Sequence, residues 1–131
     1  MCSISSTSIA FVTLSFMGQA QIIDTDHFHD YVGNDTAEIE FMIDLFIQQS
    51  STYYMEIELA YKHDDVTEWH DVAHKFKGMA GFTGATHLYA TCKQAQEDHK
   101  CTKEQKLSLL KTIEQDIENA ISFLKDYQGQ N

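Results

Sequence analysis

The chain has 131 residues, enough for one domain with a single hydrophobic core and too few for two. Nine Lys plus Arg against twenty Asp plus Glu give a formal net charge of -11. This balance argues against nucleic acid or an anionic membrane as a partner, because both require a cationic surface. The three cysteines are too few and too irregularly spaced for a disulfide framework, so a reducing cytoplasm is the expected location.

Residues 1–21 are expected to form an N-terminal extension, either flexible or folded as an extra helix, or to be sequence upstream of a start at Met17. Residues 9–17 are apolar, but no Lys or Arg precedes them. The run is also shorter than the roughly 20 residues that span a bilayer. We therefore expect no secretory signal or membrane anchor here, and we place the folded domain at residues 22–131.

The first two helices of this domain are predicted from caps and apolar spacing. Asp24 can cap a short helix that ends near Val32, before Gly33. A long helix is expected to begin after Asn34, Asp35 or Thr36 and to end near Lys62. Its apolar residues recur at steps of three and four: Ile39, Met42, Ile43, Phe46, Tyr53, Tyr54, Ile57, Ala60 and Tyr61.

A third helix is expected after a cap at Asp64 or Asp65. At about 100° per residue its apolar stripe occupies an arc of roughly 120°. His74 lies about 140° from Trp69 on the same wheel, so it points away from the core. The residues that share its face are Thr67, Asp71, Gly78 and Gly81, and those of the stripe are Val66, Trp69, Val72, Ala73, Phe76 and Ala80.

Residues 81–84 are predicted to form a tight turn, followed by a fourth helix that ends near His99. Thr102 is expected to cap the last helix. The expected core positions of these two helices are Ala85, Leu88, Tyr89, Cys92 and Ala95, then Leu107, Leu110, Ile113, Ile117, Ala120, Ile121, Leu124 and Tyr127. Long amphipathic helices joined by short loops predict an all-α fold, an antiparallel up-down-up-down four-helix bundle with a short additional N-terminal helix.

The segment around His74 carries the strongest functional signal. A neutral imidazole is a nucleophile near neutral pH, so an exposed histidine can attack a phosphoryl group. Gly78 follows one turn later and costs about 1 kcal/mol relative to alanine inside a helix, which indicates close approach by a partner. Lys77 lies three residues after His74, where its ammonium can neutralise phosphoryl charge, whereas Lys75 is expected to point elsewhere as a solvated charge.

His74, Lys77 and Gly78, followed by Gly84 and Ala85, resemble the motif of histidine-containing phosphotransfer (HPt) domains, a His-x-x-Lys-Gly run before a small-residue turn. The resemblance covers roughly residues 22–127. Residues 81–83 depart from it, because the family more often has Ser, Ala or Asn followed by Leu or Ile there. It implies that His74 is the phosphoacceptor, Lys77 an electrostatic helper and Gly78 the clearance residue.

The resemblance also implies a phosphocarrier and not an enzyme. The expected partner is the receiver domain of a response regulator or of a hybrid sensor histidine kinase, which contributes the acidic pocket and Mg²⁺. No cofactor or metal is expected in this chain, and we expect a monomer. The chain has no glycine-rich phosphate loop after a strand, so autophosphorylation from ATP is not expected.

Two other interpretations remain open at this point. His70 and His74 lie four residues apart on one helical face, close to the His-Glu-x-x-His pattern of zinc hydrolases, although Asp71 stands where that pattern has glutamate. A third ligand would have to come from His63, His87, His99 or a carboxylate. The other alternative is a helical adaptor without covalent chemistry, in which His74 is an ordinary surface residue.

Overall fold

The computed structural model describes residues 22–33 and 35–130, and every regular element in these ranges is a helix. The prediction for residues 1–21 lies outside the described residues. The helices agree closely with the expected ones: α2 (Thr25–Val32), α3 (Thr36–Lys62), α4 (Val66–Thr83), α5 (Thr86–Glu97) and α6 (Lys103–Gln130).

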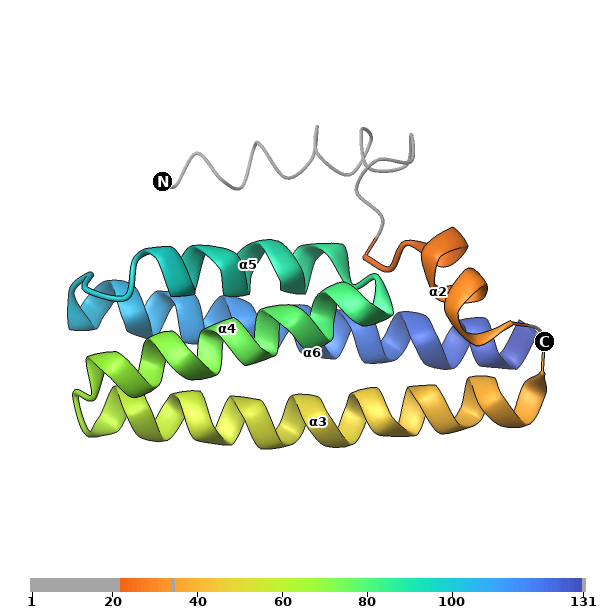
Figure 1. Ribbon diagram of the computed structural model, residues 1–131, viewed down its shortest axis with the longest axis horizontal. Helices are drawn as coiled ribbons and strands as arrows, with labels where there is room; N and C mark the ends of the chain where they lie inside the picture. Colours follow the sequence, from red (N-terminus) through yellow and green to blue (C-terminus); the bar gives the residue numbers. More distant parts are fainter. Residues whose placement is uncertain (1–21, 34, 131) are drawn as a thin grey trace.

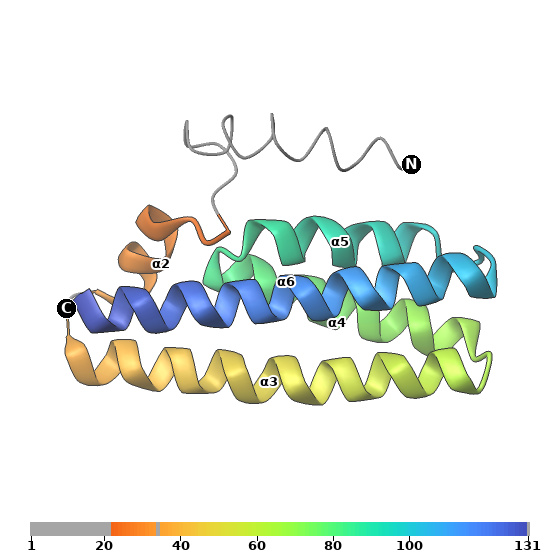
Figure 2. The same cartoon turned by 180° about the vertical axis from the view of Figure 1, so that it is seen from behind.

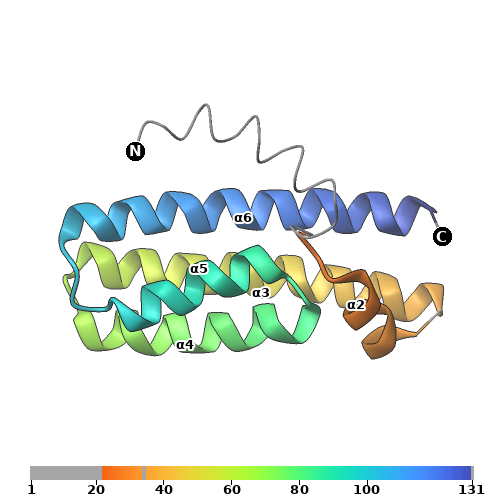
Figure 3. The ribbon, with the colours of Figure 1, turned by 90° about the horizontal axis from the view of Figure 1, so that it is seen from above.

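The four longer helices form an antiparallel bundle (Figures 1 and 2). α3 packs against α4 and α6, and α5 packs against the same two helices, so the four enclose one core. α4 and α5 are shorter than α3 and α6, and α2 lies beside the end where α4 turns into α5 (Figure 3). The predicted up-down-up-down bundle with a short N-terminal helix is therefore confirmed. No described helix is both long and apolar enough to cross a membrane.

Polar side chains fix where the helices begin. Asp24, Asp35 and Asp65 each accept a hydrogen bond from a backbone N–H in the first turn of the following helix. At α6, Thr102 Oγ1 accepts from the Gln105 N–H at 3.1 Å, and Gln105 Oε1 accepts from the Thr102 N–H at 3.0 Å. This reciprocal pair satisfies two donors that would otherwise lack partners.

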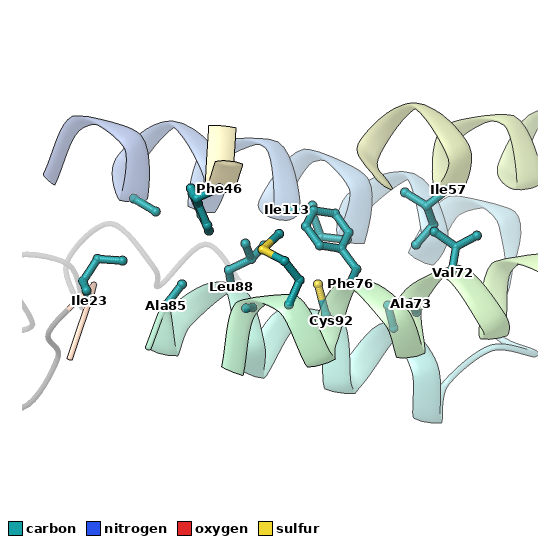
Figure 4. Close-up of a cluster of buried hydrophobic side chains, with 14 of the residues drawn as sticks. Ile23, Phe46, Ile57, Val72, Ala73, Phe76, Ala85, Leu88, Cys92 and Ile113 are labelled. Atoms are coloured by element: carbon teal, nitrogen blue, oxygen red, sulfur yellow. The ribbon is translucent and has the colours of Figure 1, made fainter. Parts of the chain in front are cut away.

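The bundle core is formed by apolar side chains from all five helices and from Ile23 and Ala85 (Figure 4). Trp69 is fully buried, and its Nε1–H donates to the Ala95 carbonyl at 2.9 Å, which ties α4 to α5. The predicted stripes of α3 and α4 largely reach this core. The largest fully buried side chains are Trp69, Phe28, Phe46, Phe76, Ile23, Ile43, Ile57, Leu88, Ile113 and Leu124.

Three residues predicted to be in the core are exposed instead: Val66, Tyr89 and Leu107. Val66 is the first residue of α4, and Leu107 lies near the beginning of α6. Lys106 takes the inward position beside Leu107 and is 7% exposed. Its Nζ lies 5.3 Å from the Trp69 ring centroid, so a cation–π contact accompanies its burial.

The predicted turn over residues 81–84 is wrong, because α4 continues through Thr83. Thr83 Oγ1 donates to the carbonyls of Met79 and Ala80, both at 3.2 Å, which keeps this polar side chain satisfied inside the helix. The helix ends at Gly84, whose φ of 79° lies in the left-handed region. The Ala85 N–H then donates to the Ala80 carbonyl, which completes a Schellman-type cap.

The α4–α5 turn is also the attachment point of α2. The Asp24 N–H donates to the Gly84 carbonyl at 2.7 Å, and the Thr86 N–H donates to the Ile22 carbonyl at 3.1 Å. His27 Nε2–H donates to the carbonyl of Phe82 at 3.0 Å, as a surface capping group. These contacts hold α2 beside the end of α4 that follows His74.

Candidate functional site

His74 lies in the middle of α4 on the solvent side. Its neighbours Val72, Ala73 and Phe76 are fully buried, and their burial fixes the rotation of the helix about its axis. His74 is then directed outward by the helical period. The prediction that this histidine points out of the core is confirmed.

The imidazole of His74 forms no hydrogen bond or ion pair with any described residue. Both ring nitrogens are therefore open to solvent or to a partner. A neutral imidazole in this state has a lone pair available for nucleophilic attack. The local structure supplies an accessible nucleophile without a base of its own.

Gly78 lies one turn after His74 and is exposed. A Cβ built at this position would have nothing within 4 Å, so packing inside this chain does not require a glycine here. Glycine inside a helix nevertheless lowers the stability of the helix by about 1 kcal/mol relative to alanine. The open space above Gly78 is available to another molecule.

Gly81 differs from Gly78 although both share the wheel face of His74. A Cβ at Gly81 would lie 3.4 Å from Cδ1 of Tyr89 on α5. The glycine therefore gives the exposed Tyr89 ring room to lie close to α4. Gly81 therefore contributes to the packing of α4 against α5. Gly78 lies on the part of the His74 face that no other described helix covers.

The two lysines after His74 lie in different surroundings. Lys75 was expected to point elsewhere, but it lines a shallow hollow of about 450 Å³ together with His74. Lys75 also lines a second groove beside Gly78. Lys77 is half-buried and lines neither of these two hollows. Lys75 is exposed, as expected for a solvated charge, and its side chain is long enough to reach beyond the wheel position of its Cα.

Gln96 of α5 lines the same hollow as His74, and the sequence analysis did not single it out. It lines the hollow with His70, Asp71, His74 and Lys75, and its Oε1 is buried without a hydrogen-bond partner among the described residues. A buried carbonyl oxygen without a donor is costly, and this oxygen is an acceptor that the described chain leaves unused. Its position beside Ala95 on the core stripe was the only signal, and it did not indicate this role.

Apolar side chains surround the other flank of Gly78. A groove of about 390 Å³ lies between α3 and α4 and is lined by Met42, Phe46, Met79 and Phe82 among others. Phe82 is 62% exposed, and Phe41 on α3 is 64% exposed. An exposed phenylalanine such as Phe82 in the lining of a groove is typical of a protein interaction surface.

Comparison with known families places this geometry in a defined class. The family model for the Hpt domain matches residues 42–126, which include most of α3 and α6 and all of α4 and α5. The match covers more than half of the chain, and the chain therefore belongs to the Hpt domain family. Its function is histidine phosphotransfer in a phosphorelay, as a phosphocarrier that is not a catalyst in itself.

Among solved structures, the histidine-containing phosphotransfer protein B (HptB) of Pseudomonas aeruginosa PAO1 is similar to this chain. The superposition covers 86% of this chain and 99% of that chain, with a TM-score of 0.76 and 20% sequence identity. This likeness shows that the two chains share a fold. A comparison with curated proteins gave no match.

The family assignment removes support from the two alternative interpretations. The zinc hydrolase hypothesis requires a third ligand beside His70 and His74, and the part of the chain that the structure describes contains no group of three His, Cys, Asp or Glu arranged for a metal ion. The adaptor hypothesis assigns no chemistry to His74. Phosphotransfer accounts for the family, the fold and the exposed imidazole together.

Proposed function

We propose that His74 is the phosphoacceptor of this Hpt domain. The proposal rests on one observation: the imidazole of His74 is exposed and has no partner among the described residues. It lies one turn from Gly78, a glycine that packing within the chain does not require. An acceptor must be reached by the active site of another protein, so exposure and clearance are its main structural requirements. His70 and His99 are both hydrogen-bonded within the chain and lack such an adjacent glycine.

The donor and recipient in this proposal are receiver domains, of a response regulator or of a hybrid sensor histidine kinase. An imidazole nitrogen of His74 attacks the phosphorus of an aspartyl phosphate, and a phosphorus–nitrogen bond forms as the phosphorus–oxygen bond to aspartate breaks. The carboxylate leaves with the bonding electron pair, and the reverse reaction returns the group. The acidic pocket of the receiver domain would hold Mg²⁺, which would supply charge neutralisation for the phosphoryl group.

Lys77 is proposed to stabilise the phosphoryl group electrostatically. It lies three residues after His74, a spacing that brings side chains together on a helix surface. Because the residue is half-buried, packing restricts the aliphatic part of its side chain. We assign Gln96 a positioning role, because its buried Oε1 can accept a hydrogen bond from an imidazole N–H in the same hollow.

We propose that the receiver domain docks over Gly78 and the apolar groove between α3 and α4. Phe82 provides exposed apolar area in this groove, and Lys75 lines both the groove and the hollow at His74. A monomeric chain would leave this surface free for successive partners. Exchange with receiver domains in the cytoplasm is consistent with the unpaired thiols of Cys92 and Cys101.

The direct test uses a phosphorylated cognate receiver domain as donor. The wild-type chain is expected to become labelled with an acid-labile, base-stable phosphate. His74→Gln should abolish the label and leave helical content and the unfolding midpoint unchanged, because His74 makes no described polar contact. His63→Gln, at an exposed histidine beyond α3, is the matched control and should be labelled like the wild type. Persistent labelling of the His74 variant would overturn the assignment.

A further inference from the structure

A hollow of about 240 Å³ lies between α3 and α6, away from the hollow that α4 and α5 form at His74. α3 packs against α4 and α6, and α5 packs against the same two helices, so the α3–α6 pair and the α4–α5 pair form opposite sides of the bundle. α4 lies in front of α6 in Figure 1 and behind it in Figure 2. A molecule bound between α3 and α6 therefore leaves His74 accessible.

Ser50 of α3 lines this hollow with an unused polar group. The residue is fully buried, and its Oγ has no hydrogen-bond partner among the described residues. A hydroxyl inside a helix often donates to the carbonyl of the preceding turn, as Thr52 Oγ1 does to Gln48 at 3.1 Å. A buried hydroxyl without such a bond is costly. The Ser50 hydroxyl is therefore a polar atom that a ligand in this hollow can satisfy.

The charged groups of the hollow are all negative. Glu114 and Glu118 lie one turn apart on α6, are exposed, and form no ion pair with any described residue. No lysine, arginine or histidine is among the described residues that line the hollow. Burial, together with the carboxylates of Glu114 and Glu58, raises the pKa of the Tyr54 hydroxyl in the same lining. Carboxylates that disfavour a phenolate favour a bound cation for the same electrostatic reason.

The remaining wall of the hollow is apolar. Ile47, Ile117 and Ile121 line it, and all three are half-buried and packed against the bundle core. An apolar wall attracts methylene groups and gives a small hydrated metal ion no favourable contact. An ammonium at the end of an alkyl chain matches both parts of the lining. Its three N–H donors rotate on a flexible stem, so they need no fixed coordination geometry.

We propose that the hollow between α3 and α6 binds a primary alkylammonium group. The Ser50 Oγ and the carboxylates of Glu114 and Glu118 accept hydrogen bonds from the ammonium, and the isoleucines pack against the alkyl chain. Lysine side chains of proteins and free polyamines both carry this group, and the net charge of -11 attracts either one. The proposal does not depend on which residue accepts the phosphoryl group.

Titration of the full chain with putrescine and with Nα-acetyl-lysine methylamide, followed by NMR, tests this site. Both probes should shift the backbone amide signals of Ser50, Ser51 and Glu118 in a saturable way and leave those of His74 and Gln96 unchanged. Butanol, which lacks the charge, should bind about tenfold more weakly. Tighter binding of putrescine would identify a free polyamine as the ligand, and tighter binding of the lysine derivative would identify a protein lysine. No saturable shift with either amine, or equal binding of butanol, would overturn the proposal.

Variants separate the site from the overall negative charge. Glu114→Gln should weaken putrescine binding by about threefold and Ser50→Ala by about fivefold. Glu104→Gln removes the same charge from an exposed position of α6 outside the hollow, so it should bind within about twofold of the wild type. Ser50→Ala should be at least as stable as the wild type, because its hydroxyl makes no described hydrogen bond. Wild-type affinity in Glu114→Gln and Ser50→Ala, or an equal loss in Glu104→Gln, would contradict the assigned site.

Discussion

Gly78 and Gly84 lie six residues apart at the C-terminal half of α4 and have opposite surroundings. A Cβ at Gly84 would lie 3.1 Å from the Asp24 carbonyl oxygen and 3.2 Å from Cδ2 of His27, whereas a Cβ at Gly78 would meet nothing within 4 Å. Gly84 also has a φ of 79°, while Gly78 lies inside the helix. The fold requires a glycine at position 84, and only an external partner gives a reason for the glycine at position 78.

The largest effect on stability is expected at Gly84. Gly84→Ala places a side chain in the left-handed region and against α2, so it should lower the free energy of unfolding by roughly 2 to 4 kcal/mol. Urea unfolding followed by circular dichroism measures this loss. Gly84→Asn is the matched control, because asparagine tolerates the left-handed conformation better but carries the same Cβ.

The asparagine variant should recover part of the stability lost with alanine and should remain below the wild type. Wild-type stability in both variants would show that the contact between α2 and the turn does not constrain this position. The contrast between the two glycines would then disappear.

At Gly78 the expected effect is on transfer and not on stability. Gly78→Phe should slow phosphotransfer from a receiver domain by about tenfold or more, because the ring occupies the space that the partner needs. Gly78→Ala should raise the free energy of unfolding by about 1 kcal/mol, since alanine is the better helix former. Transfer assays and urea unfolding on the same preparations separate the two quantities. Unchanged transfer kinetics in Gly78→Phe would remove our account of this glycine.

A smaller effect is expected at the lysines. Lys77→Ala should slow transfer by several-fold while leaving the unfolding midpoint close to the wild type, because one stabilising charge near the phosphoryl group is lost. Lys75→Ala is the matched control on the adjacent position and should have the smaller effect. If Lys75→Ala slowed phosphotransfer more than Lys77→Ala, the electrostatic role would have to be assigned to Lys75, which lines the hollow with His74.

The helices and the outward direction of His74 could be predicted because they depend on local chemistry. Aspartate caps, a Thr102–Gln105 capping box and apolar residues at helical spacing are all readable in one sequence. The core-facing stripes of α3 and α4 followed this pattern, with Ile43, Phe46, Trp69 and Phe76 all buried. In these turns a neighbouring helix covers one face completely, so hydrophobicity and burial agree.

The errors lie where burial depends on how the helices meet. Leu107 is exposed and Lys106 is buried because Lys106 faces the Trp69 ring, a contact that no pattern within α6 contains. Gln96 reaches the His74 hollow from α5, which requires the relative rotation of two helices. The extent of α4 through Thr83 depended on side-chain hydrogen bonds and on the cap at Gly84. None of these features follows from periodicity alone.

The central claim is that the phosphoryl group resides on His74, and locating it by tandem mass spectrometry is the most direct test. The chain would be phosphorylated by a phosphorylated receiver domain and fragmented under conditions that preserve phosphohistidine. We predict that the phosphate is found on His74 and on no other of the seven histidines. Phosphate on His70, His99 or any other residue, with His74 unmodified, would contradict the account.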